Sequence, residues 1–213
     1  MPTLLCFGDS NTYGTPPMEA RGAVARHPPA DRWPRVAANL LDGWDVVEEG
    51  LPGRTAQFPD PVMGAHMDGR VGLRIALGSH GPVDVLAIML GTNDVKARFG
   101  ADARMVMAGI AGLLDVAMSL EVEARHPALR VLVICPPPVL EQGPIAGEFL
   151  GARETSLGLP VLYEALARAR GAGFLDAGAV AEVSSVDGIH LDAQAQRALG
   201  RAAADAVRAL AEA

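Results

Sequence analysis

Residues 4–14, Leu4-Leu5-Cys6-Phe7-Gly8-Asp9-Ser10-Asn11-Thr12-Tyr13-Gly14, form an apolar run that ends abruptly in small polar residues. A short apolar run bounded by glycine is typical of a parallel strand that is covered on both faces. In open α/β sheets, reactive groups collect just beyond the carboxyl ends of such strands. The stretch therefore predicts a buried parallel strand with Ser10 at its tip, where a ligand would be met.

Strands and helices are predicted to alternate along the rest of the chain. Apolar runs indicate four more strands, and apolar spacings of three and four indicate the helices between them. This alternation favours an α/β fold, a three-layer αβα sandwich with a central five-stranded parallel sheet and helices on both faces. The predicted strands cover residues 44–47, 83–90, 130–135 and 173–176, and the predicted helices cover 33–41, 71–77, 102–124, 159–170 and 192–210.

The 213 residues suit a single domain, because neither an internal repeat nor a linker is visible. Two segments lack a periodic pattern. Residues 16–31 are rich in Pro, Arg and small residues, and we expect them to form a loop that makes one wall of the site. The three prolines at 136–138 cannot continue a strand ladder, so an insertion around 136–158 leaves the sheet, either as a pocket rim or as a subunit contact.

Charge and cysteine content argue against several classes of protein. With 18 basic and 25 acidic residues the net charge is -7, and no basic cluster indicates nucleic-acid binding. Cys6 and Cys135 lie in apolar runs, so we expect buried, reduced thiols and a cytoplasmic location. No basic leader precedes the first strand, and no apolar run approaches the roughly 18 residues of a membrane span. The protein is therefore expected to be soluble.

Three further motifs follow predicted strands: residues 50–54, 91–94 and 187–190. A serine nucleophile needs a base within hydrogen-bond reach, an acid that orients the base, and donors for the oxyanion. His190 is the candidate base, and Asp187 precedes it by three residues, so its carboxylate can hold the ring in the required tautomer. The other four histidines lie beside Pro, Gly or Ala without metal-ligand spacing, and we expect neither a metal nor a cofactor.

The oxyanion donors are predicted from the same motifs. Asn93 follows the most apolar strand and could point its amide into the cleft, while Gly53 could present its backbone N–H because no Cβ blocks approach. The N–H of Ser10 would be the third donor. Taken singly, each motif is also explained as a turn or a helix cap, and Asp94 is assigned to a capping role.

Four stretches resemble, in this order, the four sequence blocks of the SGNH (GDSL) hydrolase family: Gly8-Asp9-Ser10, Gly53, Gly91–Asp94 and Asp187–His190. The likeness runs from residue 4 to the last predicted helix. Residues 6–10, 48–51 and 89–97 are similar to the bacterial arylesterase/acyltransferase branch, which includes an oligomeric acyltransferase of mycobacteria. Tyr13 departs from the Trp often found there. Residues 16–31 and 136–158 match no family block.

The resemblance implies a flavodoxin-like SGNH hydrolase fold in one domain over residues 1–213. It also implies Ser10 as nucleophile, His190 as base, Asp187 as its orienting acid, and Ser10 N–H, Gly53 N–H and the Asn93 amide as oxyanion donors. These roles agree with those assigned from the residues alone. The branch favours a homo-oligomer.

We therefore expect a metal-free serine esterase that hydrolyses short-chain acyl or aryl esters through an acyl-enzyme. Acyl transfer to alcohols, or perhydrolysis, would compete in a dry pocket. A carbohydrate O-deacetylase with the same residues is an open alternative, as is a non-catalytic interaction protein. Nucleotide binding is disfavoured because residues 8–14 lack the G-x-G-x-x-G spacing, and a standard α/β-hydrolase because no serine lies in G-x-S-x-G.

Overall fold

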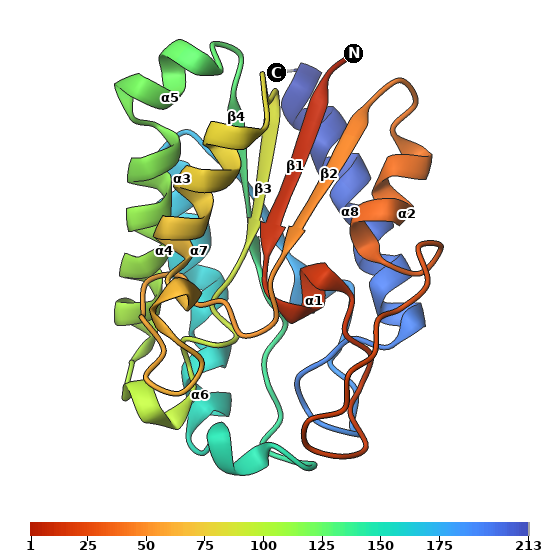
Figure 1. Cartoon of the computed structure of the whole chain (residues 1–213), viewed down its shortest axis with the longest axis vertical. Coiled ribbons are helices and arrows are strands. Elements are labelled where there is room, and N and C mark those ends of the chain that lie inside the picture. Colours follow the sequence, from red (N-terminus) through yellow and green to blue (C-terminus); the bar gives the residue numbers. More distant parts are fainter. Residues whose placement is uncertain (213) are drawn as a thin grey trace.

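A computed structural model describes residues 1–212 of the chain. Five parallel strands form one sheet in the order β2-β1-β3-β4-β5, with β1 between β2 and β3 (Figure 1). The expected α/β fold with a central five-stranded parallel sheet is confirmed. The strands are β1 (Thr3–Gly8), β2 (Asp45–Gly50), β3 (Val85–Met89), β4 (Arg130–Cys135) and β5 (Gly173–Asp176).

Helices cover both faces of the sheet, as expected. On one face pack α2 (Trp33–Leu40) and α8 (Ala193–Glu212), and on the other α3 (Gly69–Ser79), α4 (Ala103–Ala117) and α7 (Leu159–Ala169) (Figure 1). Alternation along β1 divides the core, because Leu4 and Cys6 face the α2 and α8 layer, whereas Leu5 and Phe7 face the other layer. Every one of these four side chains is fully buried.

Both cysteines are buried and unbridged, and burial raises the pKa of each thiol. The expectation of two reduced core thiols is thus confirmed. None of the helices within residues 1–212 is long and apolar enough to span a membrane.

The prediction of one helix over 102–124 is wrong in one respect, because the helix is interrupted at Met118 and Ser119. Helix α4 ends at Ala117, and a separate helix α5 (Leu120–Arg125) begins with the Ser119 hydroxyl accepting from the N–H of Val122 at 3.4 Å. A serine that caps a new first turn outweighs the continuing apolar spacing. Short elements that the pattern did not indicate are α1 (Ser10–Tyr13), α6 (Ala152–Leu157), η1 (Ala65–Met67), η2 (Ala97–Phe99), η3 (Ala146–Glu148) and η4 (Ala177–Ala179).

Two glycines allow α1 to sit directly on the carboxyl ends of β1 and β2. A Cβ on Gly8 would lie 2.0 Å from Oγ1 of Thr12, and one on Gly50 would lie 2.1 Å from the backbone nitrogen of Tyr13. Any larger residue would push the short helix away from the sheet. The close approach places Ser10, the first residue of α1, at the sheet edge where the predicted site lies.

Candidate active site

Ser10 lies at the turn from β1 into α1, with its side chain buried but open to a cavity of about 540 Å³. Asp9 caps the short helix, because its Oδ1 accepts from the N–H of Asn11 at 2.9 Å. Of the other predicted site residues, Gly53, Asn93 and His190 also line this cavity. The four motifs, far apart in the sequence, therefore meet at one edge of the sheet.

His190 connects Ser10 to Asp187. Its Nε2 lies 3.0 Å from Oγ of Ser10, and its Nδ1 lies 2.6 Å from Oδ2 of Asp187. With the proton on Nδ1 donated to the carboxylate, Nε2 is left as the acceptor for the serine hydroxyl. The arrangement can remove a proton from Ser10 and return it to a leaving group.

The Asp187 carboxylate is held by four donors. Its Oδ1 accepts from the backbone N–H groups of Ile189 and His190 at 3.0 and 2.9 Å, and its Oδ2 accepts from the N–H of Met18 at 2.7 Å in addition to the His190 ring. Burial disfavours the ionised form, but the bonds from His190 and Met18 outweigh it and lower the pKa of Asp187 to about 2. Asp187 is therefore a carboxylate at neutral pH.

Asn11, which the sequence did not single out, braces the backbone on both sides of His190. Its Nδ2 donates to the carbonyl of Ile189 at 3.1 Å, and its Oδ1 accepts from the N–H of Leu191 at 3.0 Å. Gln196 of α8 in turn donates to the Asn11 carbonyl at 2.8 Å. No pattern within the sequence indicates this role, because each partner lies more than 170 residues away.

The candidate oxyanion donors differ in how they are engaged. Gly53 has a φ of +91° and its N–H has no hydrogen-bond partner within residues 1–212. The Asn93 amide donates to the carbonyl of Arg54 at 3.0 Å and to Oδ2 of Asp9 at 3.3 Å. The bond to Asp9 is the longer of the two. Replacing it with a bond to a substrate oxyanion would therefore cost less free energy than breaking the bond to the Arg54 carbonyl. The N–H of Ser10 lies at the start of α1, where intrahelical acceptors are missing.

The capping role predicted for Asp94 is wrong. Its carboxylate accepts from the N–H of Ala56 with both oxygens at 2.9 Å, and the nearest short helix, η2, is preceded by Lys96 instead. Asp94 therefore ties the turn after β3, which carries Asn93, to the loop after β2, which carries Gly53. Burial raises the pKa of Asp94 to about 7.

Three segments wall the cavity. The loop over 16–31 contributes Met18 and residues 21–25, which confirms that it forms one wall. The insertion around 136–158 contributes Ile145, Glu148 and Phe149, so it serves as a pocket rim. Pro52, Val62 and Met63 complete a largely apolar lining near Ser10. Within residues 1–212, no three His, Cys, Asp or Glu side chains are grouped so that they could hold a metal ion.

Asp9→Asn is expected to stabilise the protein most at high pH. Burial raises the pKa of Asp9 from 3.8 to about 6, against the bond from Asn11, so ionised Asp9 favours unfolding. The loss of folding free energy caused by ionised Asp9 is absent below the pKa that Asp9 has in the unfolded chain. It is complete above the pKa that Asp9 has in the folded protein, where it reaches about 3 kcal/mol. The gain from the substitution should therefore shrink by about 2 kcal/mol between pH ~8 and ~4.5, measured by urea unfolding.

The exposed Asp42→Asn variant provides the control, with a difference from the parent chain that stays flat across this pH range. A flat difference for Asp9→Asn as well would mean that the carboxyl does not titrate as its burial implies.

Several solved protein structures are similar to this chain over nearly its whole length. No curated protein sequence matches the chain significantly. Among solved structures, a carbohydrate acetylesterase from Sinorhizobium meliloti is 38% identical with a TM-score of 0.92, covering 99% of this chain and 100% of its own. The native aryl esterase of M. smegmatis is 36% identical with a TM-score of 0.92 and the same coverage. A carbohydrate acetylesterase family member from S. meliloti is 34% identical with a TM-score of 0.89, covering both chains fully.

A parallel α/β sheet that carries serine, histidine and aspartate at its strand ends is typical of hydrolases with a serine nucleophile. The chain belongs to the GDSL-like lipase/acylhydrolase family, whose sequence profile matches residues 6–198. It is an esterase of that family, and the resemblance drawn from its four motifs is confirmed.

Proposed function

We propose that this esterase hydrolyses short-chain acyl or aryl esters through an acyl-enzyme on Ser10. The observation that carries the proposal is the continuous chain from Ser10 through His190 to Asp187, with contacts of 3.0 and 2.6 Å, facing the cavity. A hydroxyl in contact with a neutral imidazole, which is itself held by a carboxylate, is the arrangement that activates a serine.

The reaction proceeds in two halves. His190 Nε2 takes the proton of Ser10 as Oγ attacks the ester carbonyl carbon, and the resulting oxyanion is met by the N–H groups of Ser10 and Gly53 and by the Asn93 amide. The protonated ring then gives its proton to the departing alcohol, which leaves an acyl group on Ser10. Water, activated by the same ring, releases the acid. An alcohol or hydrogen peroxide in place of water would give acyl transfer or perhydrolysis.

The cavity supports a preference for small acyl groups. Its volume is about 540 Å³, and Met18, Met63 and Phe149 are among the apolar side chains that close it around Ser10. An acetyl or aryl ester fits such a space. The likeness to the M. smegmatis aryl esterase supports aryl esters among the substrates.

The decisive measurement compares p-nitrophenyl acetate with p-nitrophenyl decanoate. We expect a higher kcat/KM for the acetate, and a fluorophosphonate probe should add covalently to the peptide that contains Ser10. A higher kcat/KM for the decanoate would contradict the chain-length proposal. An adduct on any other residue would contradict the assignment of the nucleophile.

Carbohydrate O-deacetylation is the second candidate, and the likeness to the S. meliloti carbohydrate acetylesterase at 38% identity favours it. The same residues would act on an acetylated sugar hydroxyl. Hydrolysis of acetylated xylose together with inactivity toward aryl esters would make this the principal activity.

A further inference from the structure

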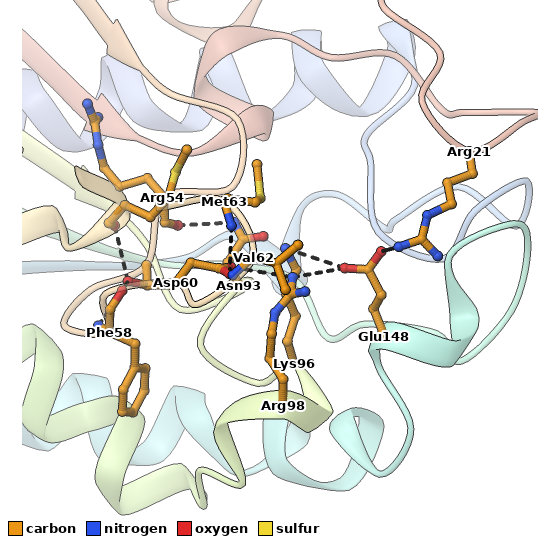
Figure 2. A network of polar contacts seen from close by, with 12 residues as sticks. Arg21, Arg54, Phe58, Asp60, Val62, Met63, Asn93, Lys96, Arg98 and Glu148 are labelled. Carbon is orange, nitrogen blue, oxygen red and sulfur yellow. Dashed lines mark hydrogen bonds and ion pairs between the residues drawn. The ribbon is translucent and has the colours of Figure 1, made fainter. Parts of the chain in front are cut away.

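A cluster of charged side chains lines the cavity on the side of η2 and η3. Figure 2 shows Arg21, Lys96, Arg98 and Glu148 gathered there, with Asp60 to the left of them in the view. The first four line the same cavity as Ser10 and His190. They come from three distant segments, so they meet only in the folded chain.

The two arginines are already occupied by carboxylates. Glu148 Oε1 lies 2.7 Å from Arg21, and its Oε2 lies 2.9 Å from Arg98, whose guanidinium also lies 3.4 Å from Asp60. Asp60 accepts in addition from two backbone N–H groups, at 2.8 and 3.0 Å. Both arginines are therefore paired with carboxylates, although within residues 1–212 Oδ2 of Asp60 accepts no hydrogen bond.

Lys96 is the exception. It is the only lysine in the sequence, and its side chain is only 7% exposed. Its closest carboxylate oxygen, Oε2 of Glu148, is 3.9 Å from Nζ, which is beyond hydrogen-bond distance, and the centroid of the Phe149 ring lies 5.7 Å from Nζ. Within residues 1–212, no hydrogen bond from this ammonium group is found. An ammonium group carries three donors and no acceptor, and burying it unpaired is costly.

Charged groups of both signs act on Lys96. Arg98 is the cation that acts on it, and Glu148, Asp60 and Asp9 are the carboxylates. Burial lowers the pKa of Lys96, and Arg98 lowers it further, whereas these three carboxylates raise it. None of the three accepts a hydrogen bond from Nζ, so an incoming anion could supply the contact that they do not.

We infer that Lys96 forms an anion subsite of the ester pocket, and that the preferred substrates are esters that carry a carboxylate. This inference rests on the proposed function, because the subsite shares its cavity with Ser10. The carboxylate would accept from Nζ of Lys96, in a buried setting where a charge-assisted bond is strong. It could belong to the acyl group or to the alcohol, and the test separates these two sources.

Two matched pairs of esters provide the test. On the alcohol side, 4-acetoxybenzoate is compared with methyl 4-acetoxybenzoate, and on the acyl side phenyl hemisuccinate is compared with its isostere phenyl 4-methylpentanoate. For each pair the ratio of kcat/KM, anionic over neutral, is measured in the parent chain and in Lys96→Met. Comparing the ratios cancels the intrinsic reactivity of each ester.

We expect the ratio of at least one pair to fall about tenfold in Lys96→Met, the loss of one hydrogen bond to a charged group. The pair that responds identifies the side that carries the carboxylate. Arg74→Met, which removes an exposed cation outside the cavity, should leave both ratios within twofold of the parent. Unchanged ratios in Lys96→Met would overturn the inference while leaving the esterase mechanism intact. If none of the four esters is hydrolysed, the proposed function is contradicted instead.

A binding measurement gives an independent readout. In protein labelled with [13C]lysine, the ε-methylene of Lys96 gives the only lysine signal, because the sequence contains no other lysine. In the Ser10→Ala background, the anionic ester of the pair whose ratio responds to Lys96→Met should shift this signal, and its neutral counterpart should shift it far less. Equal shifts with the two esters would overturn the inference.

Discussion

Ser10→Ala is expected to lower kcat for p-nitrophenyl acetate by about six orders of magnitude. Within residues 1–212, the hydroxyl of Ser10 is the only group that hydrogen-bonds to His190 Nε2, at 3.0 Å, so no other side chain there is placed to take over the acyl group. Removal of the Ser10 hydroxyl oxygen, which faces the cavity, should leave the fold unchanged. The measurement is steady-state hydrolysis together with covalent labelling by a fluorophosphonate, which should disappear.

The matched control is Ser79→Ala, at an exposed serine at the end of α3, which should keep full activity and labelling. Thermal unfolding of both variants checks that the fold is retained. Turnover in Ser10→Ala above about one per cent of the parent would remove the serine from the mechanism.

His190→Ala is expected to cost nearly as much as Ser10→Ala, again about six orders of magnitude. Within residues 1–212, the imidazole is the only base in contact with Ser10 Oγ. Asp187 cannot replace it, because the backbone N–H groups of Met18, Ile189 and residue 190 still hold its carboxylate when the ring is removed. Groups that act as one unit are not additive in their effects, so the Ser10→Ala/His190→Ala double variant should be no slower than either single variant.

His80→Ala is the control, because His80 pairs with Glu49 at 2.8 Å outside the cavity and its loss should leave turnover within about twofold. A double variant that is slower than both single variants by the product of their effects would show that Ser10 and His190 act independently. That result would contradict the proton transfer between them.

Most of the sheet could be predicted from the sequence because β1, β3 and β4 are local apolar runs, whereas β2 runs through Glu48 and Glu49 to Gly50, beyond the predicted end at residue 47. The predicted strands at 130–135 and 173–176 coincide with β4 and β5. The break between α4 and α5 could not be predicted, since apolar spacing continues through Ser119 and only the capping bond reveals the start of a new helix. A periodic pattern reports which face is buried, but not where one helix stops and the next begins.

The candidate site shows the same division. Residue type and position in the sequence were enough to indicate four site residues that follow strands or share a short loop: Ser10, Asn93, Asp187 and His190. The structure brings these residues together with Gly53, and their catalytic roles are those proposed above. Supporting contacts were missed because they cross the fold. The bonds of Asn11 to the His190 loop, and of Asp94 to Ala56, join residues that are distant in sequence and carry no local signal.

The backbone N–H of Met18 links substrate choice to proton transfer. It donates to Oδ2 of Asp187 at 2.7 Å from within the loop that walls the cavity. Redesign of residues 16–31 to admit bulkier esters would therefore disturb the acid as well as the pocket, and a proline at position 18 would delete the donor outright. Libraries that vary side chains but preserve the path of the backbone at Met18 should yield altered selectivity with turnover retained, whereas insertions or deletions next to it should lose both.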